Sequence, residues 1–94
     1  MIYHLVQKEI WKNVSTEYSP TSLKDEGFIH FSTHEQVKGT YQRFYADQEM
    51  LLLEIDEKKL KAELKFEEAD GMLFPHLYGS LNLDAVLSAK PYQA

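Results

Sequence analysis

The apolar residues of this chain gather in short runs, and this feature limits the elements that the chain can form. The main runs cover residues 2–6, 28–32 and 50–55, and polar or turn-forming residues separate them. Short apolar runs bounded in this way are typical of buried strands. The longest uninterrupted apolar stretch, residues 50–53, is far shorter than a membrane span requires.

Helical features lie between these runs. Residues 8–14 predict a short helix, and a single helical turn is expected to end at Gly27, a residue that suits a helix C-terminus. Residues 33–36 have the form of a capping box, which predicts the start of a second helix that ends near Tyr45 or Ala46. The core-facing stripe of that helix is expected to consist of Val37, Thr40, Tyr41 and Phe44.

The second half of the chain predicts strands. Residues 64–68 and 85–89 have the pattern of strands, and Asp70-Gly71 is a strong turn signal. Pro75 interrupts the apolar segment 72–79, which is expected to form a rigid aromatic loop. We therefore predict one α+β domain over residues 1–94, with a curved or split mixed sheet and two short helices.

Composition narrows the class of protein. The chain has 94 residues, a formal net charge of -5 and no cysteine. The acidic balance argues against nucleic acid and anionic membranes as main partners, and the lack of cysteine excludes disulfides and thiolate chemistry. The first apolar run begins at Ile2 without the charged lead of a signal peptide. We expect a cytoplasmic protein.

Three of the four histidines lie within apolar segments. His4 and His30 are the central residues of two predicted strands, and His76 follows Pro75. A buried imidazole without partners costs about 1–3 kcal/mol. The histidines are therefore either core residues with satisfied hydrogen bonds or the lining of a polar cleft, and the residues alone leave both readings open.

The surroundings of His30 favour a binding site. Ser32 shares a strand face with His30, and Thr33 begins the next helix, whose amides form a potential anion site. Two imidazoles, a hydroxyl and a helix start suit a ribose or a phosphate. A metal site is not expected, because the helical two-histidine zinc signature is absent. Arg43 is the sole arginine, and it is either a ligand clamp or part of a solvated face.

Acidic residues of the second half are expected to be solvated. Glu54 falls within the apolar strand and is either a catalytic carboxylate at a strand end or an exposed residue. A solvated acidic rim is predicted for Asp56, Glu57, Glu67, Glu68 and Asp70.

The sequence resembles a family known as domain of unknown function 952. The resemblance rests on Ile-Tyr-His-Leu at the N-terminus, Glu-Gly-Phe-Ile-His-Phe-Ser-Thr at 26–33, Arg-Phe-Tyr at 43–45, Leu-Leu-Glu-Ile-Asp at 52–56 and Ala-Asp-Gly-Met-Leu-Phe-Pro-His-Leu-Tyr-Gly at 69–79. These segments follow in order over nearly the whole chain. The family has no established activity, but it has been grouped by fold with the ADP-ribosyltransferase-like superfamily.

This grouping implies a split-sheet core around an NAD-binding cleft. It implies that His4 contacts the ribose on the nicotinamide side, that His30, Ser32 and Thr33 shape the nicotinamide pocket, and that His76 adds a third element. A tyrosine, Tyr41 or Tyr78, is expected to stack on the base. The late Glu-x-Glu or Gln-x-Glu motif of that superfamily is missing here, which weighs against transfer to a protein acceptor.

The residues and the family resemblance leave two candidate functions. The first is a nucleotide-binding domain that processes NAD or a related ribosyl compound, as an ADP-ribosyltransferase-like or NAD-glycohydrolase-like enzyme. In it His4, His30 and His76 are catalytic, and the ligand-binding residues are Ser32, Thr33, Tyr41, Arg43 and Tyr78. The second is a non-catalytic small-molecule-binding or protein-interaction module with the same fold. NAD is expected as a substrate, and no resident cofactor is assigned.

Overall fold

The computed structural model describes all 94 residues, and strands form most of its ordered elements. The strands are β1 (Ile2–Gln7), β2 (Glu17–Tyr18), β3 (Ile29–His30), β4 (Met50–Ile55), β5 (Glu63–Ala69), β6 (Met72–Tyr78), β7 (Leu81–Asn82) and β8 (Val86–Tyr92). The helices are α1 (Lys8–Trp11), α2 (Thr21–Asp25) and α3 (Val37–Phe44), with short 3-10 helices η1 (His34–Gln36), η2 (Glu57–Lys59) and η3 (Leu83–Ala85). None of the helices has the length and apolar character needed to cross a membrane.

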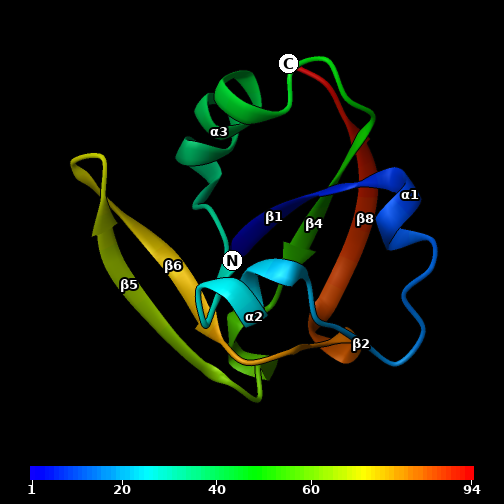
Figure 1. Ribbon diagram of the computed structural model, residues 1–94, viewed down its shortest axis with the longest axis vertical. Coiled ribbons are helices and arrows are strands. Elements are labelled where there is room, and N and C mark those ends of the chain that lie inside the picture. Colours follow the sequence, from blue (N-terminus) through cyan, green and yellow to red (C-terminus); the bar gives the residue numbers. More distant parts are fainter.

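The strands form separate antiparallel sheets. One has the order β1-β4-β8, another has the order β3-β6-β5, and β2 pairs with β7. In Figure 1 the β5–β6 hairpin projects away on the side opposite β8. The two larger sheets meet where Tyr3 and Ser32 exchange backbone hydrogen bonds of 2.8 and 2.7 Å. The predicted α+β domain with a divided sheet is confirmed, with three short α-helices in place of two. The predicted mixed sheet is wrong, because every strand pairing is antiparallel.

Side-chain alternation along β1 divides the core into two parts. Ile2 and Val6 point into a main cluster that is shared by strands of all three sheets, whereas Leu5 points to the opposite face. The main cluster consists of Ile2, Val6, Tyr18, Ile29, Phe31, Leu53, Ile55, Leu77, Leu81 and Ala85. His4 lies on the same side of β1 as Ile2 and Val6, and this places it at the main core.

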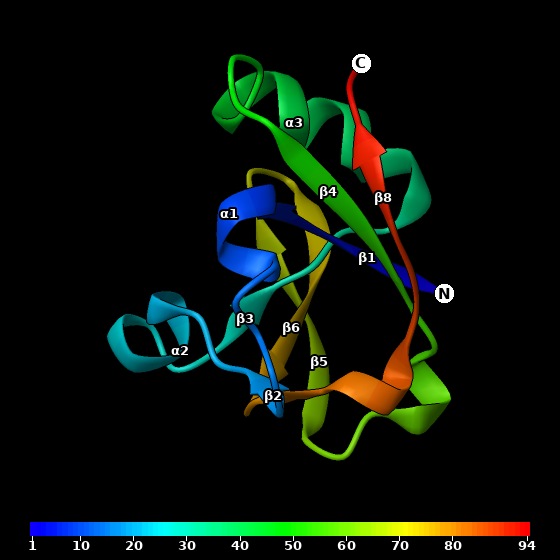
Figure 2. The same cartoon turned by 90° about the vertical axis from the view of Figure 1, so that its right-hand side faces the viewer.

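α3 covers the other face of the β1-β4-β8 sheet, near the upper end of β4 and β8 in Figure 2. Val37 and Tyr41 pack there against Leu5 and Met50, so β4 is covered on both faces as predicted. The predicted role of Phe44 is wrong, because its side chain is 57% exposed. Phe44 is the last residue of α3 and lies one turn beyond Tyr41, which already fills the contact with the sheet.

The segment that carries His76 is a strand, not the predicted loop. β6 is continuous through Pro75 and is the central strand of its sheet. Proline lacks a backbone donor, but β3 pairs with β6 only through Ile29 and His30. The next residue, Phe31, lies beyond β3, and its N–H donates to the Pro75 carbonyl at 2.9 Å. The pairing of β3 with β6 therefore does not need the backbone donor that Pro75 lacks.

Candidate functional site

The β5–β6 hairpin fixes which side chains share a face of its sheet. Its turn consists of Asp70 and Gly71, with φ values of 52° and 80°, and this is the two-residue form that suits a tight hairpin. The resulting register places Lys65 opposite His76. On the other side of β6, His30 of β3 lies directly opposite His76. The ring centroids of the two histidines are 5.3 Å apart.

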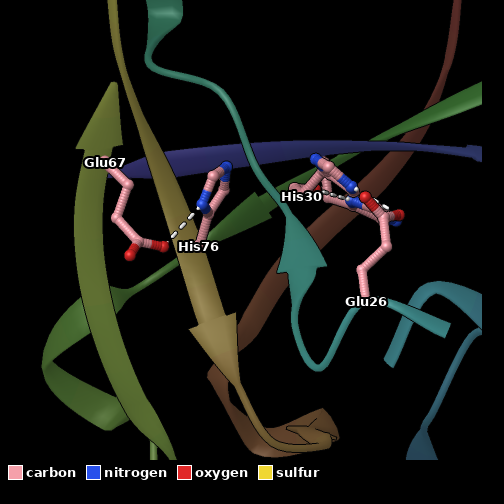
Figure 3. Close-up of polar contacts among 5 residues, drawn as sticks. Glu26, His30, Glu67 and His76 are labelled. Carbon is pink, nitrogen blue, oxygen red and sulfur yellow. Dashed lines mark hydrogen bonds and ion pairs between the residues drawn. The ribbon is translucent and has the colours of Figure 1, made fainter. Parts of the chain in front are cut away.

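Each of these two histidines is paired with its own carboxylate. The His76 Nδ1–H donates to Glu67 Oε1 at 2.8 Å, and the His30 Nε2–H donates to Glu26 Oε2 at 3.0 Å. Figure 3 shows His76 between the strands that carry Glu67 and His30. A carboxylate bound to one ring nitrogen fixes the orientation and the tautomer of an imidazole. No hydrogen bond within the protein engages the second ring nitrogen of either histidine.

Aromatic rings surround the two imidazoles. Phe28 stacks on His76 with ring centroids 4.1 Å apart and an interplanar angle of 18°, and it meets His30 edge-on at 4.9 Å. Tyr78 lies 5.3 Å from the Phe28 ring. His76, on which Phe28 stacks, is only 6% exposed, whereas the side chain of His30 is 53% exposed. His30 is therefore the more accessible imidazole.

Glu67 is the polar centre of this group. Its Oε1 accepts hydrogen bonds from both the Tyr78 hydroxyl and the His76 ring. These two bonds lower the pKa of Glu67, the one from Tyr78 contributing most. The same hydrogen bond raises the pKa of Tyr78. Glu67 is thus an ionised acceptor at neutral pH. We call the group formed by Phe28, His30, Glu67, His76 and Tyr78 the histidine face.

His4 lies beside the histidine face but is bonded differently. Its Nδ1–H donates to the main-chain oxygen of His30 at 2.6 Å, and its Nε2 accepts from the Tyr18 hydroxyl at 2.9 Å. Burial of the ring lowers the pKa of His4 to about 4, so the imidazole is neutral near pH 7. Both nitrogens are satisfied within the protein, as in a core histidine. His4 touches the main chain of His30, whose own ring turns toward Glu26.

Ser32 and Thr33 have structural partners. The Ser32 side chain is 7% exposed, and its hydroxyl lies 3.5 Å from that of Thr40. The predicted capping box is confirmed, because Thr33 and Gln36 exchange side-chain to backbone hydrogen bonds. The Thr33 N–H donates to Gln36 Oε1 at 2.9 Å. The amide of Thr33 is therefore already engaged.

Tyr41 and Arg43 lie outside the histidine face. Tyr41 is 2% exposed and packs edge-on against Tyr92 at 5.2 Å. It borders a surface hollow of about 640 Å³ between the end of α3, the start of β4 and the end of β8. Arg43 pairs with Asp70 at 2.8 Å, which ties α3 to the hairpin turn. A smaller hollow of about 310 Å³ lies at Gln7–Glu9 and Gln48–Glu49, and the histidine face borders neither hollow.

The sequence does not predict that two carboxylates, Glu67 and Glu26, belong to the site. The prediction that Glu67 belongs to a solvated acidic rim is wrong, because Glu67 accepts hydrogen bonds from His76 and Tyr78. A signal for it existed, because a two-residue turn at Asp70-Gly71 pairs residue 67 with residue 74 and so places Glu67 diagonally beside His76. Nothing local indicated Glu26. The structure holds no group of three or more metal-ligating side chains.

Comparison with known proteins places the chain in a family. The family described as protein of unknown function DUF952 matches residues 5–89. A crystal structure of the protein CC0527 from Caulobacter crescentus is 31% identical, with a TM-score of 0.82, and the match covers 96% of this chain and 83% of that one. A double-mutant form of CC0527 matches at 30% identity with the same TM-score. No curated protein matches the sequence. The chain is a member of the DUF952 family.

Proposed function

We propose that the histidine face binds the nicotinamide-ribose part of NAD or of a related ribosyl nucleotide. The observation that carries the proposal is the pair His30 and His76, which lie directly opposite each other with one carboxylate each. Each imidazole keeps one ring nitrogen free of protein partners. Two imidazoles whose ring centroids are 5.3 Å apart, each with a free nitrogen, suit the neighbouring hydroxyls of a ribose.

The negative charge of the site favours the nicotinamide half of NAD, which carries a positive charge, over the phosphates. Glu26 and Glu67 face the two imidazoles, and Lys65, whose Nζ lies 5.0 Å above the Tyr78 ring, is the nearby cation. A pyridinium ring carries positive charge and stacks well on aromatic side chains such as Phe28. A phosphate would instead meet two carboxylates. Nicotinamide-containing ligands are therefore expected to bind more tightly than ADP-ribose.

The superfamily grouping that the family resemblance implies extends the proposal to cleavage of NAD. In hydrolysis the bond between the ribose C1′ and the nicotinamide nitrogen breaks, and its electron pair stays on nicotinamide. Water then bonds to C1′ and loses a proton, which gives ADP-ribose. Positive charge develops on the ribose as the bond breaks, and an ionised Glu67 stabilises that charge.

Titration of the isotope-labelled protein, followed by NMR of the histidine rings, tests binding. NAD and nicotinamide riboside are expected to shift the signals of His30 and His76, and ADP-ribose is expected to shift them less at equal concentration. His34 is an internal control, because it is exposed and packs on Tyr3 away from the histidine face. Unchanged His30 and His76 signals at millimolar NAD would contradict the proposal.

Matched variants separate a binding role from a structural one. The His30→Gln variant is expected to keep its melting temperature and to lose the NAD response, whereas His34→Gln keeps both. Release of nicotinamide from NAD, measured for the wild type and for His30→Gln, tests cleavage separately from binding.

The second candidate is a non-catalytic binding module. Its favouring observation is that His4 has both ring nitrogens bonded within the protein. NAD binding without nicotinamide release supports this candidate.

A further inference from the structure

The outer edge of β5 is an unpaired strand edge. β5 is the last strand of its sheet, and Figure 1 shows it on the outside of the projecting hairpin. In a hairpin closed by a two-residue turn, the residues that flank the turn, here Ala69 and Met72, form a hydrogen-bonded pair. The alternation of such pairs directs the backbone groups of residues 63, 65, 67 and 69 toward β6. Those of Leu64, Phe66 and Glu68 therefore face the open edge.

The charges of β5 complement a second copy of the same strand. In antiparallel self-pairing centred on Phe66, Phe66 faces its own equivalent, and Lys65 of each copy faces Glu67 of the other. Opposite charges at directly opposed positions stabilise a strand pair, and like charges destabilise it. A register centred on Lys65 would oppose two lysines, and one centred on Glu67 would oppose two carboxylates. A register centred on Leu64 would pair only the first three residues of each strand.

The apolar pattern fits the same register. Phe66 is 48% exposed and Leu73, its diagonal neighbour on β6, is 58% exposed. An exposed aromatic residue on an unprotected edge is a site for pairing with another strand. Two other long strands are outer strands, β1 and β8. The outer edge of β1 is joined to Ser32 through the backbone hydrogen bonds of Tyr3, and β8 contains Pro91, which lacks a backbone donor. β5 contains no proline.

We infer that the chain forms a twofold-symmetric dimer through β5, with Phe66 on the axis and two Lys65–Glu67 pairs across it. The dimer joins the two hairpin sheets into one sheet of the order β3-β6-β5-β5-β6-β3. Because Glu67 belongs to the histidine face, each copy places its Lys65 at the edge of the other copy's site. Two seven-residue strands make a small interface, so the expected dissociation constant is micromolar or weaker.

Sedimentation equilibrium from micromolar to millimolar protein, without any ligand, tests the dimer. The wild type is expected to show a concentration-dependent change from monomer to dimer. The Phe66→Pro variant removes the outward-facing donor and the aromatic ring on the proposed axis, but no hydrogen bond to β6, and it is expected to stay monomeric with a folded circular dichroism spectrum. A wild type that stays monomeric at millimolar concentration overturns the inference, and so does a folded Phe66→Pro variant that still forms the dimer.

Charge reversal tests the register. The variants Lys65→Glu and Glu67→Lys each create like-charge pairs and are expected to weaken self-association about tenfold or more. An equimolar mixture of the two restores opposite charges at every pair and is expected to form a heterodimer. Lys58→Glu, an exposed reversal outside β5, is the matched control and leaves the dimer unchanged. Failure of the mixture to associate, while the wild type does so, overturns this register.

Discussion

Acidification is expected to destabilise the fold through His4. Burial of the ring lowers the pKa of His4 to about 4 from 6.5, the hydrogen bond to His30 works in the opposite direction, and the charge of His30 adds to the lowering. Between these two pKa values the unfolded chain binds a proton that the folded chain does not bind. Stability therefore rises with pH across this window and is lost as the pH falls from 6.5 toward 4.

The magnitude follows from the two pKa values. Since one pKa unit corresponds to about 1.4 kcal/mol, the loss attributable to His4 at pH 4 is about 3 kcal/mol. This is a large share of the about 5–15 kcal/mol by which small domains are stable. The physical cause is specific. A protonated His4 would need Nε2 to act as a donor, and the Tyr18 hydroxyl that now donates to it would have to reverse its bond.

Urea unfolding of the wild type and of the His4→Gln variant at a series of pH values measures the contribution of His4 to the free energy of unfolding. Glutamine does not titrate, so the difference between the two proteins reports the titration of residue 4, and groups that do not interact with His4 cancel. The free energy of unfolding of the wild type is expected to fall relative to the variant by about 3 kcal/mol between neutral pH and pH 4. Parallel pH profiles, or a His4 ring signal that titrates near 6.5 in NMR, would refute the reasoning.

Three further substitutions have defined outcomes. Gly79→Ala places a methyl group where the Ala62 Cβ would lie 2.6 Å away, so urea unfolding is expected to show a loss of about 2 kcal/mol. Thr33→Ala removes the capping side chain, with an expected loss of about 1 kcal/mol in the same assay. Glu67→Gln removes the charged acceptor of the Tyr78 hydroxyl and is expected to lower the pKa of Tyr78, measured by NMR titration of its ring.

Local patterns predicted most of the fold because they act over few residues. The apolar runs gave β1 and β4, the capping box gave the start of the segment that contains α3, and Asp70-Gly71 gave the hairpin turn. Pro75 misled the prediction, since proline is tolerated in a central strand only where a neighbour ends. The pairing of β3 with β6 ends at His30. This end depends on the tertiary structure, so the local sequence of β6 does not indicate it.

The candidate site was only partly predictable for the same reason. His30, His76 and Tyr78 come together because β3 and β5 flank β6, and only the β5–β6 register could be worked out from a turn. The pairing of β3 with β6 joins segments more than forty residues apart and depends on the packed core. Matching positions in two apolar runs predict that His4 and His30 face one site, but in the structure the His4 ring contacts the main chain of His30.

The two proposals meet at Glu67, and this makes them thermodynamically linked. In the dimer Lys65 of one copy lies against Glu67 of the other, while a bound nicotinamide ring directs its positive charge to the same carboxylate. Two cations that share one carboxylate weaken each other, so ligand binding is expected to disfavour the dimer. By reciprocity the dimer disfavours the ligand by the same factor. An anionic or neutral ligand lacks this antagonism, so the sign of the linkage itself reports which half of the nucleotide lies beside Glu67.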